Sequence, residues 1–229
     1  MCAIVGAIFN EPSAADFELL RRVFVESKIR GMHATGVSYI KHDRIETLKL
    51  PVPADKFPFD FASYVNEDGN LYMVGHCRYS TSDLIYNQPI SNNEYSVVHN
   101  GVISQELHEN WKQLYGYDCS TKNDTELILK TLEEQKCVLN TWQDASIAAC
   151  ELWQSKKIRF YRNGKRPVYR TMLNNGVVIT STSNIAGRAG MKNAEEVPMN
   201  TYITVDSSLE QNTIIIENTN SDLQRINYE

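Results

Sequence analysis

The sequence predicts an α+β fold in the form of a sandwich, and three observations support this prediction. Short apolar segments rich in β-branched residues recur along the chain and are separated by turn signals, as is typical of strands. Apolar residues at helical spacing are confined to a few segments. Strands dominate both ends of the chain while helices cluster between them, which disfavours the regular alternation of βαβ units. With 229 residues and no linker-like composition, the chain suits one large domain with a substantial core.

The first part of the chain begins with a predicted strand over residues 1–8, an apolar run interrupted by Gly6. A helix-entry signal at residues 10–13 follows, and apolar residues at helical spacing predict a helix from there to about Ile29. Further strands are expected at 36–40, 47–50, 71–77 and 95–98, with a short helix or an irregular segment over 53–65.

The middle of the chain predicts two helices. Asn123 with Glu126 three residues later matches a capping box and predicts a helix over 124–135. A second helix is predicted from apolar residues that would share one helical face, namely Trp142, Ala145, Ala149 and Leu152. The remainder is predicted to be mostly strands, at 158–161, 168–172, 177–181, 202–205 and 213–216, with a short helix near 183–188.

The composition disfavours several classes of protein. The net charge is −5, from 23 basic and 28 acidic residues without a basic stripe, so we expect no nucleic-acid partner. The apolar runs are strand-sized and no apolar leader follows a charged start, so we expect neither a membrane span nor secretion. Five cysteines without a C-x-x-C pair indicate a reducing cytoplasm rather than disulfides or structural zinc. Because His76 and His99 lack a clear third ligand, we expect no metal and no cofactor.

Cys2 has an unusual position, at the start of the first predicted strand and directly after the initiator methionine. Removal of Met1 would leave a thiol and a free α-amine on one residue. The thiolate is a nucleophile, and an α-amine with a pKa of about 7.7–8.0 is a usable base at neutral pH. Cys2 would then hold nucleophile and base together. The alternative is a small buried cysteine that simply begins a core strand.

Four further polar clusters lie where predicted strands or helices end, and each has a purely structural interpretation. Arg30-Gly31 resembles a helix C-terminus capped by glycine. Arg78 could be a surface arginine. Asn100-Gly101 is a strong hairpin-turn dipeptide. Asp124 could belong only to a helix N-terminus, where a carboxylate is favourable.

Taken together and in this order, the clusters resemble the class II glutamine amidotransferases, the glutaminase domain of the N-terminal nucleophile hydrolases. The matching motifs are Cys2-Ala3-Ile4-Val5-Gly6, Arg30-Gly31 through Gly36, Gly75-His76-Cys77-Arg78-Tyr79-Ser80-Thr81, Asn87-Gln88-Pro89, Val97-Val98-His99-Asn100-Gly101-Val102-Ile103 and Asn123-Asp124-Thr125-Glu126. The resemblance implies a four-layer αββα sandwich and a glutaminase domain over residues 2–205. Residues 206–229 would form a C-terminal extension, without a separate synthase domain.

The resemblance also implies roles for the catalytic residues. Cys2 would attack the side-chain amide of glutamine and form a thioester. The Asn100 side chain and the Gly101 backbone N–H would form the oxyanion hole, whose loss typically costs about 10²–10³ in rate per donor.

Glutamine would be recognised at both of its charged ends. Arg78 would bind the α-carboxylate with its planar donor fork, and Asp124 would bind the α-ammonium. The resemblance adds four residues that bind the head group or support the nucleophile: Thr81, Tyr79, Arg30 and Gly31. Three residues depart from the usual family pattern, namely Ala3, Tyr79 and Ser82.

The expected function is therefore hydrolysis of glutamine, with the ammonia supplied to an acceptor on a separate synthase-like subunit. Three alternatives stay open at this point. The protein could be a free-standing glutaminase, another N-terminal nucleophile amidohydrolase, or a non-catalytic binding module. The Arg78 and Asp124 pair favours an amino-acid substrate over a plain amide.

Overall fold

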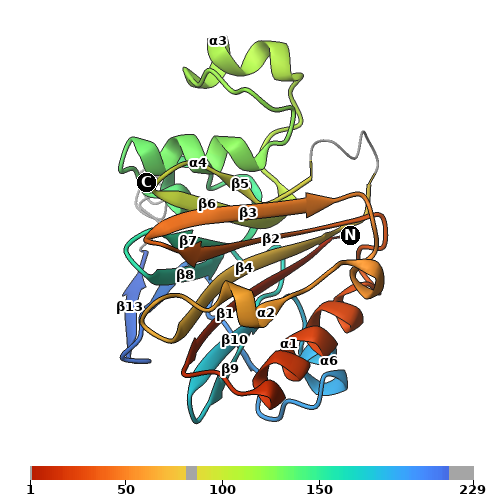
Figure 1. Ribbon diagram of the computed structural model, residues 1–229. Coiled ribbons are helices and arrows are strands. Elements are labelled where there is room, and N and C mark those ends of the chain that lie inside the picture. Colours follow the sequence, from red (N-terminus) through yellow and green to blue (C-terminus); the bar gives the residue numbers. More distant parts are fainter. Residues whose placement is uncertain (1, 81–86, 217–229) are drawn as a thin grey trace.

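The computed structural model describes residues 2–80 and 87–216. Two antiparallel sheets pack face to face in the centre of the molecule, with helices on both outer sides (Figure 1). Across the first sheet, the described strands are β11 (Glu195–Glu196), β9 (Tyr169–Leu173), β10 (Gly176–Thr180), β1 (Ala3–Asn10), β4 (Asn70–Arg78), β2 (Ala34–Lys41) and β3 (Arg44–Leu50). Across the second sheet they are β13 (Gln211–Ile215), β12 (Thr201–Val205), β8 (Lys157–Arg162), β7 (Ser146–Trp153), β6 (Tyr95–Val102) and β5 (Ile90–Ser91).

The helices form the two outer layers. On the first sheet lie α1 (Ala14–Ser27) and α6 (Ser183–Arg188), near the short η1 (Ala54–Lys56) and α2 (Phe61–Tyr64). On the second sheet lie α4 (Thr125–Glu133) and α5 (Val138–Thr141). Beyond α4, the segment with η3 (His108–Asn110) and α3 (Trp111–Tyr115) extends away from the sheets (Figure 1). The predicted sandwich of four layers is confirmed.

Strand β1 occupies the centre of the first sheet, between β4 and β10. Its side chains alternate between two cores. Val5 and Phe9 join the core under α1, whereas Ile4 and Ile8 join the core between the two sheets. Burial on both faces explains why β1 appears in the sequence as a continuous apolar run.

Helix α1 begins with a capping box, in which the Ser13 side chain accepts from the Asp16 N–H and the Asp16 side chain accepts from the Ser13 N–H. Leu20, Val23 and Phe24 bury its inner face. The predicted entry signal is thus confirmed, although the helix ends at Ser27, before Arg30-Gly31.

The predicted helix over 142–152 is wrong, because residues 146–153 form the strand β7. This strand lies between β6 and β8, and both of its faces are buried. Ala149 contacts the core under α4, while Ala148 and Leu152 face the other sheet. A strand that is buried on both faces lacks the alternation of apolar and polar residues that identifies a half-buried strand. The spacing of Trp142, Ala145, Ala149 and Leu152 therefore matched the helical period by chance.

The predicted capping box at Asn123 is also wrong. Helix α4 begins at Thr125, with Asp124 at the N-cap position. The Glu126 carboxylate instead accepts hydrogen bonds from the backbone N–H groups of Ser120 and Thr121, at 2.8 and 2.6 Å. The Glu126 carboxylate therefore binds the loop before the helix, whereas in a capping box it would accept a hydrogen bond from the N–H of the N-cap residue.

Part of the segment expected to be a C-terminal extension belongs to the second sheet. Residues 211–215 form β13 and pair with β12.

None of the helices in the part of the chain that the structure describes is long and apolar enough to cross a membrane.

Candidate active site

A cavity of about 420 Å³ opens where the chain enters β1 and where β4 and β6 end. Five residues of the predicted site line it, namely Cys2, Arg78, Tyr79, Gly101 and Asp124. Ala3 pairs with Cys77 in the first sheet, and this register places Cys2 beside Arg78. Segments that are far apart in the sequence therefore meet at one cavity.

Cys2 is held at the cavity by backbone contacts on both sides. Its Sγ lies 3.9 Å from the carbonyl oxygen of Tyr79, and its own carbonyl oxygen accepts a hydrogen bond of 2.9 Å from Arg30 Nε. Burial and the nearby charge of Arg166 lower the pKa of Arg30 from its ordinary value. Arg30 does not line the cavity, and its hydrogen bond to the Cys2 carbonyl oxygen helps to fix the position of Cys2.

Gly31 supports the same corner through close packing. A Cβ at this position would lie 2.1 Å from the Cys77 carbonyl oxygen, so only glycine lets the two backbones approach this closely. The next residues continue this contact, since the His33 N–H donates to the Arg78 carbonyl oxygen at 3.0 Å. The His33 ring packs against the Tyr79 ring, with centroids 4.8 Å apart.

Asn100 and Gly101 lie within β6 and do not form a hairpin turn, because the strand continues to Val102. Gly101 has φ +151°, and a Cβ there would lie 1.7 Å from the Ser146 carbonyl oxygen. Asn100 is 4% exposed, and its Nδ2 has no hydrogen-bond partner among the described residues. A buried amide without a partner is costly, and Asn100, unlike Gly101, is not among the residues that line the cavity.

The orientation of β6 also determines where the Gly101 N–H points. Ile147, opposite Gly101 on β7, uses both its N–H and its carbonyl oxygen for Asn163. The Gly101–Ile147 pair is thus not hydrogen-bonded, and the Gly101 N–H faces away from β7. The His99 N–H, two residues earlier, points the same way and donates to Gln88 Oε1 at 2.6 Å. Both Gly101 and Gln88 line the cavity.

Arg78 and Asp124 bring opposite charges to the cavity from the end of β4 and the start of α4. Arg78 is only 9% exposed. Asp124 Oδ2 accepts a 2.7 Å hydrogen bond from the Ile103 N–H, which ties the carboxylate to the chain just after Asn100 and Gly101. A cavity with a cationic and an anionic side chain suits a zwitterion such as an amino acid.

His76 and His99 also line the cavity, and both are buried. Burial lowers the pKa of His76 to about 3, with smaller contributions from the charges of Arg78 and His99. Burial also lowers the pKa of His99, against the opposing effects of Asp124 and the Ser146 carbonyl. His76 is thus neutral at pH 7. Among the described residues, no group of three or more His, Cys, Asp or Glu side chains could hold a metal ion.

Sequence reasoning missed part of the lining. The segment between β6 and α4 contributes Glu106, His108 and Trp111, and its approach to Cys2 depends on packing that no local motif encodes. Gln88 also lines the cavity, and the Asn87-Gln88-Pro89 motif by itself predicts no role for it. Thr81 lies outside the described residues, as do the other positions from 82 to 86.

A family model described as a glutamine amidotransferase domain matches residues 59–222, which is more than half of the chain. The chain belongs to this glutamine amidotransferase family. Arg78, Gly101 and Asp124 lie inside the matched segment, whereas Cys2 and Arg30 precede it. A search of curated proteins gives no match.

Solved structures resemble this glutamine amidotransferase domain along most of its length. The glutamine phosphoribosylpyrophosphate amidotransferase from B. subtilis complexed with ADP and GMP is 17% identical, with a TM-score of 0.69 over 93% of this chain and 49% of that chain. A structure described as the allosteric regulatory enzyme of purine biosynthesis is 17% identical, with a TM-score of 0.72 over 93% and 48%. A glutamine aminotransferase class-II domain protein from Silicibacter pomeroyi is 11% identical, with a TM-score of 0.56 over 94% and 100%.

At these identities the likeness concerns the fold. The predicted αββα fold of the N-terminal nucleophile hydrolases is confirmed by the two antiparallel sheets and by these neighbours. The chain spans about half the length of the first two structures.

The buried His76 predicts a pH dependence of stability. Between its pKa of about 3 in the folded protein and the ordinary value of 6.5, the unfolded chain binds a proton that the folded chain does not. The free energy of unfolding should therefore fall as the pH drops from 6.5 towards 3, with a share from His76 of up to about 1.4 kcal/mol per pH unit.

Denaturant unfolding at pH 6.5 and pH 4.5 checks this expectation. His76→Asn should lose less stability between the two pH values than the wild type, with a residual slope from His99. Lys192→Gln is the control, because this exposed position carries no group that titrates between the two pH values and the substitution should leave the slope unchanged. An unchanged slope in His76→Asn would show that the folded protein already accommodates the protonated ring.

Proposed function

We propose that this chain hydrolyses the side-chain amide of glutamine through a thioester on Cys2 and supplies the ammonia to an acceptor. One observation carries the proposal: Cys2, Arg78, Gly101 and Asp124 come from separate segments and line one cavity. A domain used only for assembly needs none of these groups. We take residues 2–205 as the glutaminase domain and residues 206–229 as its extension.

The proposed attack uses a mature chain that begins at Cys2. The α-amine takes the thiol proton, and the thiolate adds to the side-chain carbonyl carbon of glutamine. Asn100 Nδ2 and the Gly101 N–H stabilise the oxyanion. The amide nitrogen leaves as ammonia with the proton returned by the α-ammonium. Water then cleaves the thioester, which releases glutamate and restores the thiol.

Arg78 and Asp124 orient the substrate for this attack. Arg78 binds the α-carboxylate through two parallel hydrogen bonds, and Asp124 binds the α-ammonium. The hydrogen bond from the Ile103 N–H to Asp124 connects this charge contact to the strand that carries the oxyanion donors. The charge pair favours glutamine over the plain amides of the amidohydrolase alternative.

We further propose that the protein acts in the cytoplasm. All five cysteines are free in the structure, and three of them are only partly buried. Free cysteines are the usual state in a reducing compartment, which supports the cytoplasm as the place of action.

The nucleophile is tested by Cys2→Ala and by a homogeneous preparation that retains Met1. Both should lose glutamate release by about 10⁴-fold or more, because each lacks either the thiol or the free amine. Intact mass establishes the N-terminus, and thermal unfolding establishes that the fold persists. Cys137→Ala, at a partly buried cysteine elsewhere, should keep full activity. Normal turnover by the Met1-bearing protein would rule out the α-amine mechanism.

Substrate recognition is tested by Arg78→Lys and Asp124→Asn. Each should raise KM for glutamine by about 10- to 100-fold, since a hydrogen bond to a charged group contributes about 1.5–3 kcal/mol. Arg44→Lys, at an exposed position of β3, is the control and should leave KM unchanged. Steady-state kinetics with glutamine gives the comparison. Wild-type KM values in both site variants would make these residues structural and would withdraw glutamine as the substrate.

We further propose that the ammonia passes to a separate synthase-like subunit. Three exposed apolar side chains on segments near Cys2, namely Ile29 and Met32 after α1 and Tyr79 after β4, support a docking surface there. The side chains are 70%, 53% and 49% exposed, and Tyr79 also lines the cavity.

The partner is tested by affinity purification from the native cell with the wild type and with Met32→Glu. The wild type should retain a synthase-like protein, and that partner with its acceptor substrate should raise a low basal glutaminase rate. Met32→Glu should lose the partner while keeping the basal rate. Leu114→Glu, at a comparably exposed position of α3, should retain it. Full basal activity without any specific partner would favour the free-standing glutaminase.

A further inference from the structure

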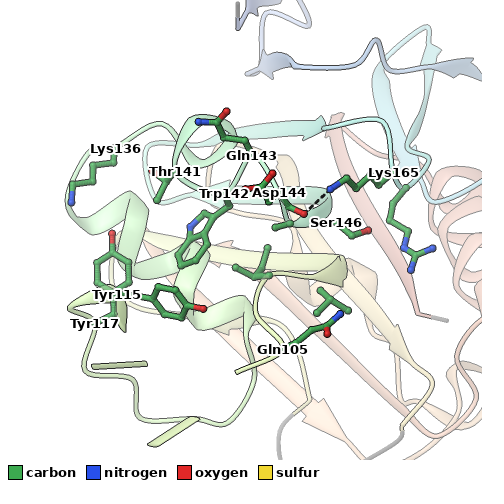
Figure 2. Close-up of a pocket in the computed structure, with 14 residues that line it drawn as sticks. Gln105, Tyr115, Tyr117, Lys136, Thr141, Trp142, Gln143, Asp144, Ser146 and Lys165 are labelled. Atoms are coloured by element: carbon green, nitrogen blue, oxygen red, sulfur yellow. Dashed lines mark hydrogen bonds between the residues drawn. The ribbon is translucent and has the colours of Figure 1, made fainter. Parts of the chain in front are cut away.

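A second and larger cavity, of about 860 Å³, lies beside the candidate active site. It is bounded by the end of β6, the residues after α3, the loop between α5 and β7, and the loop between β8 and β9 (Figure 2). The proposed glutamine chemistry uses none of its interior. Its volume falls within the range of about 300–1,000 Å³ that is typical of small-molecule sites.

One end of this cavity is cationic. Lys165 and Arg166 follow each other in the β8–β9 loop, and Lys165 Nζ donates to the Asp144 carbonyl oxygen at 2.6 Å. Neither side chain forms an ion pair with a carboxylate in residues 2–80 or 87–216. The Arg166 Nε is buried and has no hydrogen-bond partner within the same ranges. A buried guanidinium donor without a partner on a cationic loop fits an anionic ligand.

The other end of the cavity is aromatic. Tyr115 and Tyr117 lie on the opposite side of Trp142 from Lys165 (Figure 2). The Tyr115 and Trp142 rings meet edge to face with centroids 5.0 Å apart. Hydrogen bonds hold these rings in place, from Trp142 Nε1 to Thr131 and from the Tyr117 hydroxyl to Glu134. Tyr115, Tyr117 and Trp142 thus form a preformed aromatic wall at this end of the cavity.

We propose that this cavity binds a small phosphorylated molecule that carries a ring, with the phosphate at Lys165 and Arg166. Arginine binds phosphate through its donor fork, and lysine adds a point charge. The ring lies against the wall of Tyr115, Tyr117 and Trp142, where aromatic side chains provide a large contact area. Inorganic phosphate alone would use only one end of the cavity.

The same cavity is joined to the active site by two hydrogen bonds. Ile103 lines the second cavity and donates its N–H to Asp124, while Ser146 lines it and accepts from His99 Nε2 at 3.1 Å. The charge of Arg166 also lowers the pKa of both Arg30 and His99. A bound phosphate would offset that charge, so occupancy of the cavity is coupled to the glutamine site. This coupling rests on the proposed glutaminase function, whereas the binding does not.

Isothermal titration calorimetry tests the binding, with AMP, UMP and glucose 6-phosphate as probes against adenosine, uridine and glucose. At least one phosphorylated probe should bind about tenfold or more tightly than its unphosphorylated counterpart. Arg166→Gln should weaken that binding by about tenfold or more, which corresponds to about 1.4 kcal/mol. Lys192→Gln, at an exposed position after α6, should bind like the wild type.

Two outcomes would overturn the site: no phosphorylated probe binding with Kd below about 10 mM, or equal affinity in the wild type and Arg166→Gln. Circular dichroism checks the fold of each variant. If Arg166→Gln does not fold, Lys165→Gln decides by the same criterion.

The coupling is measured as the KM for glutamine with and without the bound probe. It should change by about threefold or more in the wild type and stay constant in Arg166→Gln, and a constant KM in the wild type would refute the coupling. Calorimetry decides the binding even if the chain releases no glutamate, so failure of the glutaminase proposal and failure of this site are distinguishable.

Discussion

The position of β1 in the centre of the first sheet is the constraint on which the candidate site depends. Hydrogen bonding to β4 on one side and to β10 on the other sets its register, and burial on both faces prevents it from shifting. A slip of one residue would exchange its two sets of side chains between the cores. The same register brings Cys2 beside Arg78, so the packing of the fold and the placement of Cys2 have one cause.

Around this strand end, the site is assembled by close backbone contacts more than by side-chain contacts. Gly31 approaches the Cys77 carbonyl, and Gly101 approaches the Ser146 carbonyl, at distances that a Cβ would prevent. Arg30 adds a hydrogen bond to the backbone of Cys2. Because rigid backbone contacts set the positions of the loops, the functional groups are held before any ligand arrives, which reduces the cost of ordering them on binding.

Much of this architecture could be predicted from local sequence patterns, and the predictions that were wrong have physical causes. The continuous apolar run of β1 and the apolar face of α1 are visible in the sequence, because the run has the length of a strand and the face follows the helical period. Strand β7 was predicted as a helix, because burial on both faces removed its alternation. Asn100-Gly101 matched a hairpin turn, yet pairing with β7 keeps it in a strand. The lining by Trp111 and Glu106 could not be predicted, since it depends on how a long connection packs against distant strands.

The pairing of β1 with β10 has a consequence for synthesis on the ribosome. Val5 lies opposite Thr180, so the first strand leaves the ribosome long before its second partner exists. At 5–20 residues per second, translation of the intervening segment takes about 10 to 35 s. During this interval β1 lacks one neighbour, and its apolar faces are available to chaperones.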